Sequence, residues 1–391
     1  MDLVDVTGNP LADALKVNSN FVTVAAAIAA IPTSPAGGSV PGFLDVKDFG
    51  AVGDGITDDT VAILAGYEAA CLVKGTLLFP SGTYVCSGLD MGGAPHRGCT
   101  LQGAAYDGRG NGYLSSRILL APGANRNLFK LLPGDAPHQI FRNLVLDGNA
   151  VNQTANEYIV KSEDDTTPSV YPYGFHMEFV HFTNGRGGGL YLGKRRGWNY
   201  LNNVIGYMNG VGNAGHGIYV DTYDVTMNHV NIGNSYGYNL YLASTSQLEA
   251  NATNLYYGQL GGMYIGAGVT DMAFTNGSID RNLRFGIQSA KNTSTTYLGA
   301  RTFMGTRFLG NSSIGDGQFP DVMVPTGDKD FIFTGCSFMG ADTANRSAFA
   351  IQFADTTGSV KIGPCKFAPA ASFRWGITSA PSQVITDNRI S

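Results

Sequence analysis

Several acidic side chains between positions 178 and 249 could perform acid–base chemistry if the fold gathers them. Enzymatic hydrolysis of a glycosidic bond uses two carboxyl groups, about 5–5.5 Å apart when configuration is retained and about 6.5–9.5 Å apart when it is inverted. Asp221 is the first choice as general acid or nucleophile, with Asp224 or Glu249 as its partner. Glu178 is a further carboxylate in an earlier part of the chain. For each of them the alternative is a solvated carboxylate in a turn.

Four tyrosines recur in similar apolar segments and form a second set of candidate site residues. Tyr191, Tyr219, Tyr241 and Tyr264 follow one another at steps of 28, 22 and 23 residues. Each lies between two aliphatic residues, so period-2 alternation turns the tyrosines outward from one face. Strands stacked about 4.8 Å apart would spread the four over about 14 Å. The row is either a saccharide-binding strip or an aromatic ladder covered by a loop or by another subunit.

The chain around these residues repeats with a period of 22–30 residues. A second column of alternating residues starts at Met227 and Ala250 and continues through Phe274, Phe303, Phe333, Ile362 and Ile385. Short alternating strands at such a period are typical of a solenoid whose coils stack on one another. Asparagines recur near the expected strand ends, where stacked amides could form ladders. The repeat therefore predicts an all-β parallel β-helix, in which carboxylates one or two coils apart reach glycosidase distances.

Composition agrees with this architecture and excludes other classes. The 391 residues include 53 glycines, roughly twice the usual share, without the three-residue period of collagen. A hydrophobic fraction of 43% is too high for a disordered chain, and nothing approaches 18 consecutive apolar residues. The net charge of −5 argues against a nucleic-acid partner. We therefore expect no nucleic acid and no membrane insertion.

Cysteine and histidine spacings indicate neither a metal site nor a disulfide framework. The five cysteines lack Cys-x-x-Cys spacing, and the six histidines lack the spacing of zinc enzymes. Cys336 and Cys365 occupy matching repeat positions, where buried free thiols are expected. We predict no metal, no cofactor and folding in a reducing compartment. No secretory signal is recognisable after Met1.

The sequence divides into a head, a neck and a body. Residues 1–31 have apolar spacings of three and four, which predict a short helical head. Residues 32–42 are rich in proline and glycine and read as a linker. Residues 43–391 form the predicted β-helix body. Within it a strand is expected over 141–146, and residues 147–173 lack periodicity and are predicted to be a lateral loop.

The start of the body carries a recognisable signature. DFGAVGDGITDDT, then a helix of about 60–73, then LLFPSGTYV closely resembles the opening of pectate-lyase-like right-handed parallel β-helix proteins. That family includes polygalacturonase-type glycosidases and many phage tailspikes. The resemblance implies a single-stranded right-handed β-helix whose N-terminal end is capped by the helix. It also implies that Asp54, Asp58 and Asp59 are structural caps rather than catalysts.

A shorter match concerns one histidine. Gly215-His216-Gly217 is similar to a motif of polygalacturonases in which the histidine assists the acid, so His216 is a secondary catalytic candidate. The other motifs of those enzymes are not recognisable. A lyase mechanism would instead need a base beside neutralising cations, for which Arg281 and Arg284 are available. Arg281 is also a candidate substrate-binding residue, although surface ion pairing would explain both arginines.

The predicted head resembles the KVNxNF helical openings of phage tail and baseplate-attached proteins, through Lys16-Val17-Asn18-Ser19-Asn20-Phe21. This resemblance implies a homotrimeric tailspike made in the bacterial host cytoplasm, attached to the phage tail through residues 1–40, and acting on a bacterial surface polysaccharide. The preferred hypothesis is a depolymerase, hydrolase or lyase. A spike that only binds glycan is the first alternative, favoured by residues 384–391 ending within another predicted coil. A free polysaccharide enzyme is the second.

Overall fold

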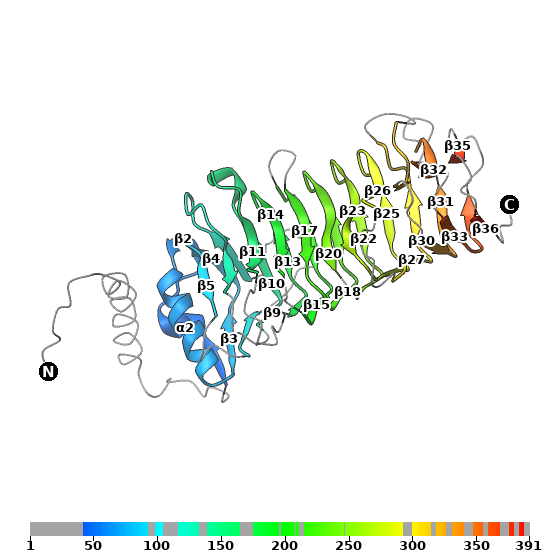
Figure 1. Cartoon of the computed structure of the whole chain (residues 1–391). Helices are drawn as coiled ribbons and strands as arrows, with labels where there is room; N and C mark the ends of the chain where they lie inside the picture. Colours follow the sequence, from blue (N-terminus) through cyan, green and yellow to red (C-terminus); the bar gives the residue numbers. More distant parts are fainter. Residues whose placement is uncertain are drawn as a thin grey trace, which may run out of the picture.

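The computed structural model shows a β-helix that extends from an N-terminal helix to the last coil (Figure 1). The described residues are 42–92, 98–104, 116–132, 139–164, 174, 176–194, 197–207, 209–210, 215–245, 247–291, 299–313, 318–325, 331–339, 347–354, 359–367, 375–378 and 383–386. The predicted head and nearly all of the neck lie outside them. Among the described residues, no helix is long and apolar enough to cross a membrane.

Three parallel sheets make up the solenoid, and successive coils contribute one strand to each in turn, except at the two ends. Sheet A has thirteen strands: β1 (Phe43–Asp45), β3 (Thr76–Phe79), β6 (Thr100–Gly103), β9 (Ile140–Arg142), β12 (His176–Glu178), β15 (Asn199–Asn202), β18 (Val225–Asn228), β21 (Leu248–Asn251), β24 (Met272–Thr275), β27 (Arg301–Met304), β30 (Phe331–Thr334), β33 (Ser359–Ile362) and β36 (Gln383–Thr386). Sheet B has twelve: β2 (Asp54–Asp58), β4 (Gly82–Cys86), β7 (Ser116–Leu120), β10 (Leu144–Asp147), β13 (His181–Thr183), β16 (Ile205–Tyr207), β19 (Asn231–Gly233), β22 (Asn254–Tyr256), β25 (Ser278–Asp280), β28 (Arg307–Leu309), β31 (Ser337–Met339) and β34 (Lys366–Phe367). Sheet C has eleven: β5 (Leu89–Met91), β8 (Phe129–Leu131), β11 (Tyr158–Ser162), β14 (Gly188–Leu192), β17 (His216–Asp221), β20 (Tyr238–Thr245), β23 (Gly261–Val269), β26 (Phe285–Ser289), β29 (Val322–Val324), β32 (Phe349–Phe353) and β35 (Trp375–Thr378).

The predicted repeat is confirmed by the strand register. In sheet C, Tyr191 pairs with Tyr219, Tyr219 with Tyr241, and Tyr241 with Tyr264. The aliphatic residues on either side of these tyrosines are fully buried in the core. The second column lies in sheet A, in register from Met227 to Ile362. At the last coil Ile362 pairs with Thr386, so the sequence alignment, which placed Ile385 there, is wrong by one residue.

The N-terminal signature folds as predicted, and its aspartates bind backbone. Helix α2 (Thr60–Leu72) follows the 3-10 turn η1 (Val46–Phe49) and lies at the N-terminal end of the sheets (Figure 1). Asp59 accepts the amides of Val52 and Gly53, at 2.7 and 3.2 Å. Asp58 accepts the amide of Thr60 at 2.9 Å, and Asp54 accepts those of Ile56 and Thr57 within β2. These carboxylates therefore accept hydrogen bonds from nearby backbone amides, which explains their structural role.

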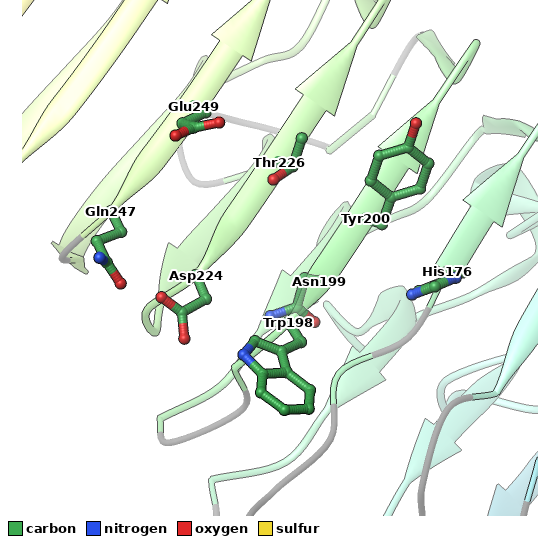
Figure 2. Close-up of a pocket in the computed structure, with 8 residues that line it drawn as sticks. All are labelled: His176, Trp198, Asn199, Tyr200, Asp224, Thr226, Gln247 and Glu249. Atoms are coloured by element: carbon green, nitrogen blue, oxygen red, sulfur yellow. The ribbon is translucent and has the colours of Figure 1, made fainter.

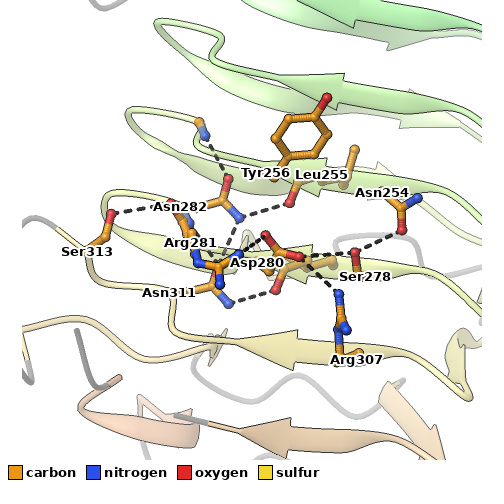
Figure 3. Close-up of polar contacts among 12 residues, drawn as sticks. Asn254, Leu255, Tyr256, Ser278, Asp280, Arg281, Asn282, Arg307, Asn311 and Ser313 are labelled. Carbon is orange, nitrogen blue, oxygen red and sulfur yellow. Dashed lines mark hydrogen bonds and ion pairs between the residues drawn. The ribbon is translucent and has the colours of Figure 1, made fainter. Parts of the chain in front are cut away.

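Corner residues explain much of the asparagine content. Several take a left-handed backbone between one sheet and the next, among them Asn143, Asn203 and Asn276, a conformation that asparagine tolerates better than most residues. Inside the coils, Asn282 accepts a hydrogen bond from Asn239 and donates one to Asn311, at 3.1 and 2.8 Å. Figure 3 shows part of this network beside the Asp280 ion pairs. Among the asparagines that the sequence singled out near strand ends, Asn254 donates to Asn231 at 2.7 Å and Asn276 donates to Asn251 at 3.2 Å, so stacked amides do pair there.

Two predictions about the N-terminal half are wrong. Residues 141–146 do not form one strand, because Asn143 turns the chain from β9 in sheet A to β10 in sheet B. The segment 147–173 is not one loop, since it holds the turn η2 (Ala150–Asn152) and strand β11 of sheet C. Its stretch 165–173 lies outside the described residues. The mixed sequence of β11 (Tyr-Ile-Val-Lys-Ser) was too short to be recognised as a strand by periodicity.

The expectation that no disulfide forms is also wrong. Cys71 near the end of α2 is bonded to Cys99, just before β6. The two are 28 residues apart, about one coil, so stacking brings together cysteines that no sequence motif connects. A disulfide is at odds with the reducing compartment expected from the sequence. Cys86, Cys336 and Cys365 are free and buried, as was predicted for the last two.

Candidate functional site

A hollow lies on the outer face of sheet A, at its edge with sheet C. It measures about 570 Å³, and we call it the sheet A hollow. Figure 2 shows its lining: His176, Trp198, Asn199, Tyr200, Asp224, Thr226, Gln247 and Glu249. Two of the predicted catalytic residues, Asp224 and Glu249, are therefore brought together here.

The sheet register explains how four coils supply this lining. His176 pairs with Tyr200, Tyr200 with Thr226, and Thr226 with Glu249, so these residues form one outward row across β12, β15, β18 and β21. A second row stands at the corner before the strands. It consists of Trp198, Asp224 and Gln247, and all three have left-handed backbones, with φ of 58°, 54° and 63°. The corner row and the strand row face the same hollow (Figure 2).

Asp224 and Glu249 lie on neighbouring coils and face the same hollow. Glu249 lies directly opposite Thr226, and Asp224 precedes Thr226 by two residues. With strands about 4.8 Å apart and a rise of about 3.3 Å per residue, the two α-carbons are separated by roughly 8 Å. Two carboxyl groups placed on one face in this way can act on one bound sugar, as the acid and base of a glycosidase do.

The two carboxyl groups also differ in environment. Asp224 is partly buried, and this burial raises the pKa of its carboxyl group above the ordinary value. Glu249 is exposed on the same face. Such a contrast between two neighbouring carboxylates is what separates a general acid from a general base.

Aromatic side chains border the carboxylates. The Trp198 side chain is 58% exposed at the corner, and the Tyr200 ring lies 5.6 Å from the ring of His176. An exposed indole offers a flat apolar face with a polar edge, which suits the apolar face of a sugar. The hollow thus combines a carboxylate pair with an aromatic platform.

Asp221 does not share this hollow. It lines a second one of about 610 Å³ on the sheet C side of the same corner, the sheet C hollow: Lys194, Asp221, Thr222, Tyr223, Ala243, Ser244, Thr245 and Gly268. The Asp221 carboxylate lies 3.9 Å from Lys194 Nζ. Burial raises the pKa of Asp221, and Lys194 opposes that shift. The pairing of Asp221 with Glu249, which the sequence suggested, is not brought about within either hollow.

The four tyrosines form a continuous ladder, which we call the tyrosine ladder. Ring centroids are 4.8, 5.0 and 4.6 Å apart from Tyr191 to Tyr264, and the planes differ by only 9°, 7° and 17°. Each inner ring therefore has both faces covered by its neighbours. The ladder presents ring edges and hydroxyl groups rather than the open faces on which a sugar would stack. Its geometry is that of a packed aromatic stack.

His216 lies at the far end of β17 from Asp221. The five steps along the strand from His216 to Asp221 put roughly 16 Å between their α-carbons. Its ring is 4.4 Å from that of Tyr241, and its Nδ1 accepts the amide of Tyr238 at 3.1 Å. Burial lowers the pKa of His216 to about 4, so the imidazole is neutral at pH 7. These contacts place His216 with the tyrosine ladder and away from the carboxylates.

The remaining predicted residues are engaged in ion pairs. Glu178 accepts a hydrogen bond from Arg142 at 2.9 Å on sheet A, one row beyond the strand row of the hollow. Arg281 stands at the corner after β25, with its guanidinium 3.9 Å from Asp280. Asp280 also contacts Arg307 at 3.4 Å (Figure 3). Neither Glu178 nor Arg281 lines either hollow.

Sequence reasoning missed His176, Trp198 and Tyr200. One signal was present, since Trp198 is one of only two tryptophans and precedes the Asn199 strand in the way Asp224 precedes the Val225 strand. Aligning the sheet A column backwards by two coils would have placed Tyr200 and His176 in the row of Glu249.

Comparisons with known proteins agree with this fold. Residues 43–258 match the model of a family described as rhamnogalacturonase A/epimerase, pectate lyase-like. The mannuronan C5-epimerase AlgE6 of Azotobacter vinelandii is 37% identical over 114 residues, which cover 28% of this chain and 13% of the epimerase. The chain thus spans only a small part of the curated relatives that it matches.

Two solved structures are similar over most of the chain. The A-module of the Azotobacter vinelandii epimerase AlgE4 has a TM-score of 0.60 and 19% identity, covering 89% of this chain and all of the module. A full-length tailspike protein 2 from a bacteriophage of Escherichia coli O157:H7 has a TM-score of 0.61 and 15% identity. That match covers 82% of this chain and 42% of the tailspike. At these identities the likeness concerns the fold.

Proposed function

The chain belongs to the rhamnogalacturonase A/epimerase, pectate lyase-like family, and on that premise we propose that it is a phage tailspike that binds and hydrolyses a bacterial surface polysaccharide. The observation that carries the proposal is the Asp224–Glu249 pair in the sheet A hollow. The pair combines a partly buried carboxyl group of raised pKa with an exposed carboxylate on the same face of the solenoid. The curated relatives, named as epimerases of mannuronan, and the tailspike neighbour support a polysaccharide ligand.

In this mechanism Asp224 is the general acid. Burial raises its pKa, which is the direction that favours the protonated form, and Asp224 donates its proton to the glycosidic oxygen as the bond to the anomeric carbon breaks. Glu249 is the general base and takes a proton from a water molecule. The oxygen of that water bonds to the anomeric carbon from the opposite face, so the configuration inverts. One water molecule is consumed, and the proton received by Glu249 returns to Asp224 through solvent.

The aromatic lining would hold the sugar beside the acid. Trp198 occupies the corner row next to Asp224, and its exposed indole can stack on a pyranose ring. Tyr200 and His176 extend the surface along the strand row. The glycan would then run across coils, parallel to the solenoid axis.

The wider assignment includes the assembly. We propose a homotrimer attached to the phage tail or baseplate through residues 1–40, and thus located in the virion. The tailspike similarity and the sequence of the head support this. Sedimentation velocity of the full chain tests it, since a monomer at micromolar concentration would contradict the trimer.

The function is tested on a panel of purified capsular polysaccharides and lipopolysaccharide O-chains. We expect release of new reducing ends from one glycan, and we expect NMR of the first product to show an inverted anomeric signal. A retained anomer would contradict the roles of Asp224 and Glu249. Binding without any cleavage would favour the alternative of a spike that only recognises glycan, and an unsaturated product would favour a lyase.

A further inference from the structure

The sheet C hollow is a built cavity in the wall of the solenoid. Strands β20 and β23 have eight and nine residues, longer than the other strands of sheet C. Their register shifts after Leu242, so Ser244 pairs with Gly268 and also with Asp221 of β17. This irregularity extends the two strands past the end of β17 and forms the floor of the hollow. The repeat of the coils does not require it, because β14 and β26 have five residues each.

The lining carries groups that are arranged for a polar ligand. Asp221 and Lys194 form a loose pair at 3.9 Å, with side chains 12% and 62% exposed. Thr245 lines the hollow, is only 3% exposed, and its Oγ1 has no hydrogen-bond partner among the described residues. A buried hydroxyl without a partner costs free energy unless a bound molecule or water satisfies it. The exposed Ser244 adds another hydroxyl group.

These groups suit sugar hydroxyls better than a metal ion. The described residues contain no cluster of three or more histidine, cysteine or acidic side chains that could hold a metal. A carboxylate accepts hydrogen bonds from two adjacent hydroxyl groups, and an ammonium group donates to a third oxygen. Lys194, Asp221 and Ser244 together supply both kinds of partner.

The location connects this cavity with the carboxylate pair. Residues 221–224 form the corner between the two hollows, with Asp221 and Tyr223 lining one and Asp224 lining the other. Three residues span at most about 11 Å. One glycan chain can therefore contact both sides of the corner.

We propose that the sheet C hollow is a second saccharide subsite, in which Asp221, Lys194 and Ser244 bind hydroxyl groups of the glycan that occupies the sheet A hollow. The proposal rests on the proposed function, because the same glycan is the ligand. Asp221 is then a binding residue and not the general acid. Because the subsite lies round the corner, only oligosaccharides long enough to cross residues 221–224 gain from it.

Binding is measured separately from cleavage to test the subsite. The full chain carrying Asp224→Asn and Glu249→Gln serves as a non-cleaving parent. Its probes are size-fractionated oligosaccharides made by partial acid hydrolysis of the polysaccharide that it recognises. Isothermal titration calorimetry gives Kd for each length, for the parent and for the parent with Asp221→Asn or Ser244→Ala. Asp271→Asn is the matched control, a carboxylate just before β24 and outside both hollows.

We expect Asp221→Asn to raise Kd about tenfold and Ser244→Ala about threefold, for long oligosaccharides only. The shortest oligosaccharides and the Asp271→Asn control should bind as the parent does. Long oligosaccharides that bind both variants like the parent would overturn the subsite while leaving the proposed function intact. A parent that binds no oligosaccharide of any glycan would overturn both. Binding by the parent together with no cleavage by the wild type would overturn only the acid–base roles.

Discussion

Two faces of the same coils carry very different outward rows. On sheet C the tyrosine ladder repeats one residue type in β14, β17, β20 and β23, and its rings stack at 4.6–5.0 Å. On sheet A the row across β12, β15, β18 and β21 reads His176, Tyr200, Thr226 and Glu249, a different residue in each coil. In the repeated row each ring packs on the rings of the neighbouring coils. The varied row lines a hollow with a carboxylate pair.

The contrast suggests how to interpret rows in a solenoid. Identical side chains in register can pack on one another, as they do in other stacked sheets, so their repetition is explained by stability. A residue that breaks the row gains no such partner from the coils beside it. Breaks of this kind, such as Glu249 on the strand and Asp224 at the corner, are therefore the better candidates for chemistry.

The largest expected effect comes from removing the acid. Asp224→Asn should lower kcat by about 10² to 10⁴-fold, because general acid catalysis contributes on that order. Tyr219→Phe in the tyrosine ladder should leave kcat unchanged within about twofold, since the stacked ring is kept. Reducing-end release from the recognised polysaccharide measures both. Comparable losses in the two variants would mean that the ladder takes part in catalysis and that the contrast between the faces is false.

The second prediction concerns Asp321, a buried aspartate that interrupts a row of asparagines inside the solenoid. The interior row of Asn239, Asn282 and Asn311 ends at the fully buried Asp321, whose Oδ1 accepts hydrogen bonds from Asn311 and Ser347 at 2.7 Å each. Burial raises the pKa of Asp321 to about 7. An unfolded aspartate has a pKa near 3.9, so between about pH 4 and pH 7 the unfolded chain loses a proton that the folded chain keeps. The free energy of unfolding must therefore fall as pH rises through this window.

We expect this fall to be on the order of 4 kcal/mol, obtained from the difference between the wild type and Asp321→Asn. Urea denaturation at pH 4, 5.5, 7 and 8.5 and constant ionic strength measures it. Asp54 and Asp58, whose pKa values are lowered by hydrogen bonds, act in the opposite direction in both proteins and cancel in the difference. Parallel pH profiles would show that Asp321 stays ionised within the row.

The sequence alone predicted the solenoid well because the repeat is visible as local alternation of apolar and polar residues. Alternation around Tyr191 and Tyr219 determines which side chains enter the core, and a step of 22–30 residues determines the coil. Strand β11 was missed because its five residues have no close copy elsewhere in the chain. Cys71 and Cys99 were missed because their approach depends on how one coil lies on the next.

The site was predicted only in part, for a related reason. Asp224 and Glu249 were both named from sequence, yet Asp221 was ranked first because its equivalents in the other coils, Gly193, Ala243 and Gly266, are small and uncharged. The chain turns a corner at residues 221–224, so Asp221 and Asp224 line different hollows. Periodicity along one strand carries no information about that turn. Trp198 was passed over because its role depends on the corner row and not on its neighbours in sequence.

The smallest expected effects come from two aromatic residues: the loss of one should lower stability, and the loss of the other should weaken glycan binding. Tyr241→Ala should lower the free energy of unfolding by about 2 kcal/mol, because it removes a half-buried ring stacked on both sides, at 5.0 Å from Tyr219 and 4.6 Å from Tyr264. Glycan affinity should be unchanged.

Trp198→Ala should leave stability within about 0.5 kcal/mol, since the indole is 58% exposed, but raise Kd or KM about tenfold through the lost sugar platform. Urea denaturation and calorimetric titration of both variants give all four values. If Trp198→Ala destabilised the fold while Tyr241→Ala weakened binding, the ladder would be the glycan surface, and repetition would mark function in this solenoid.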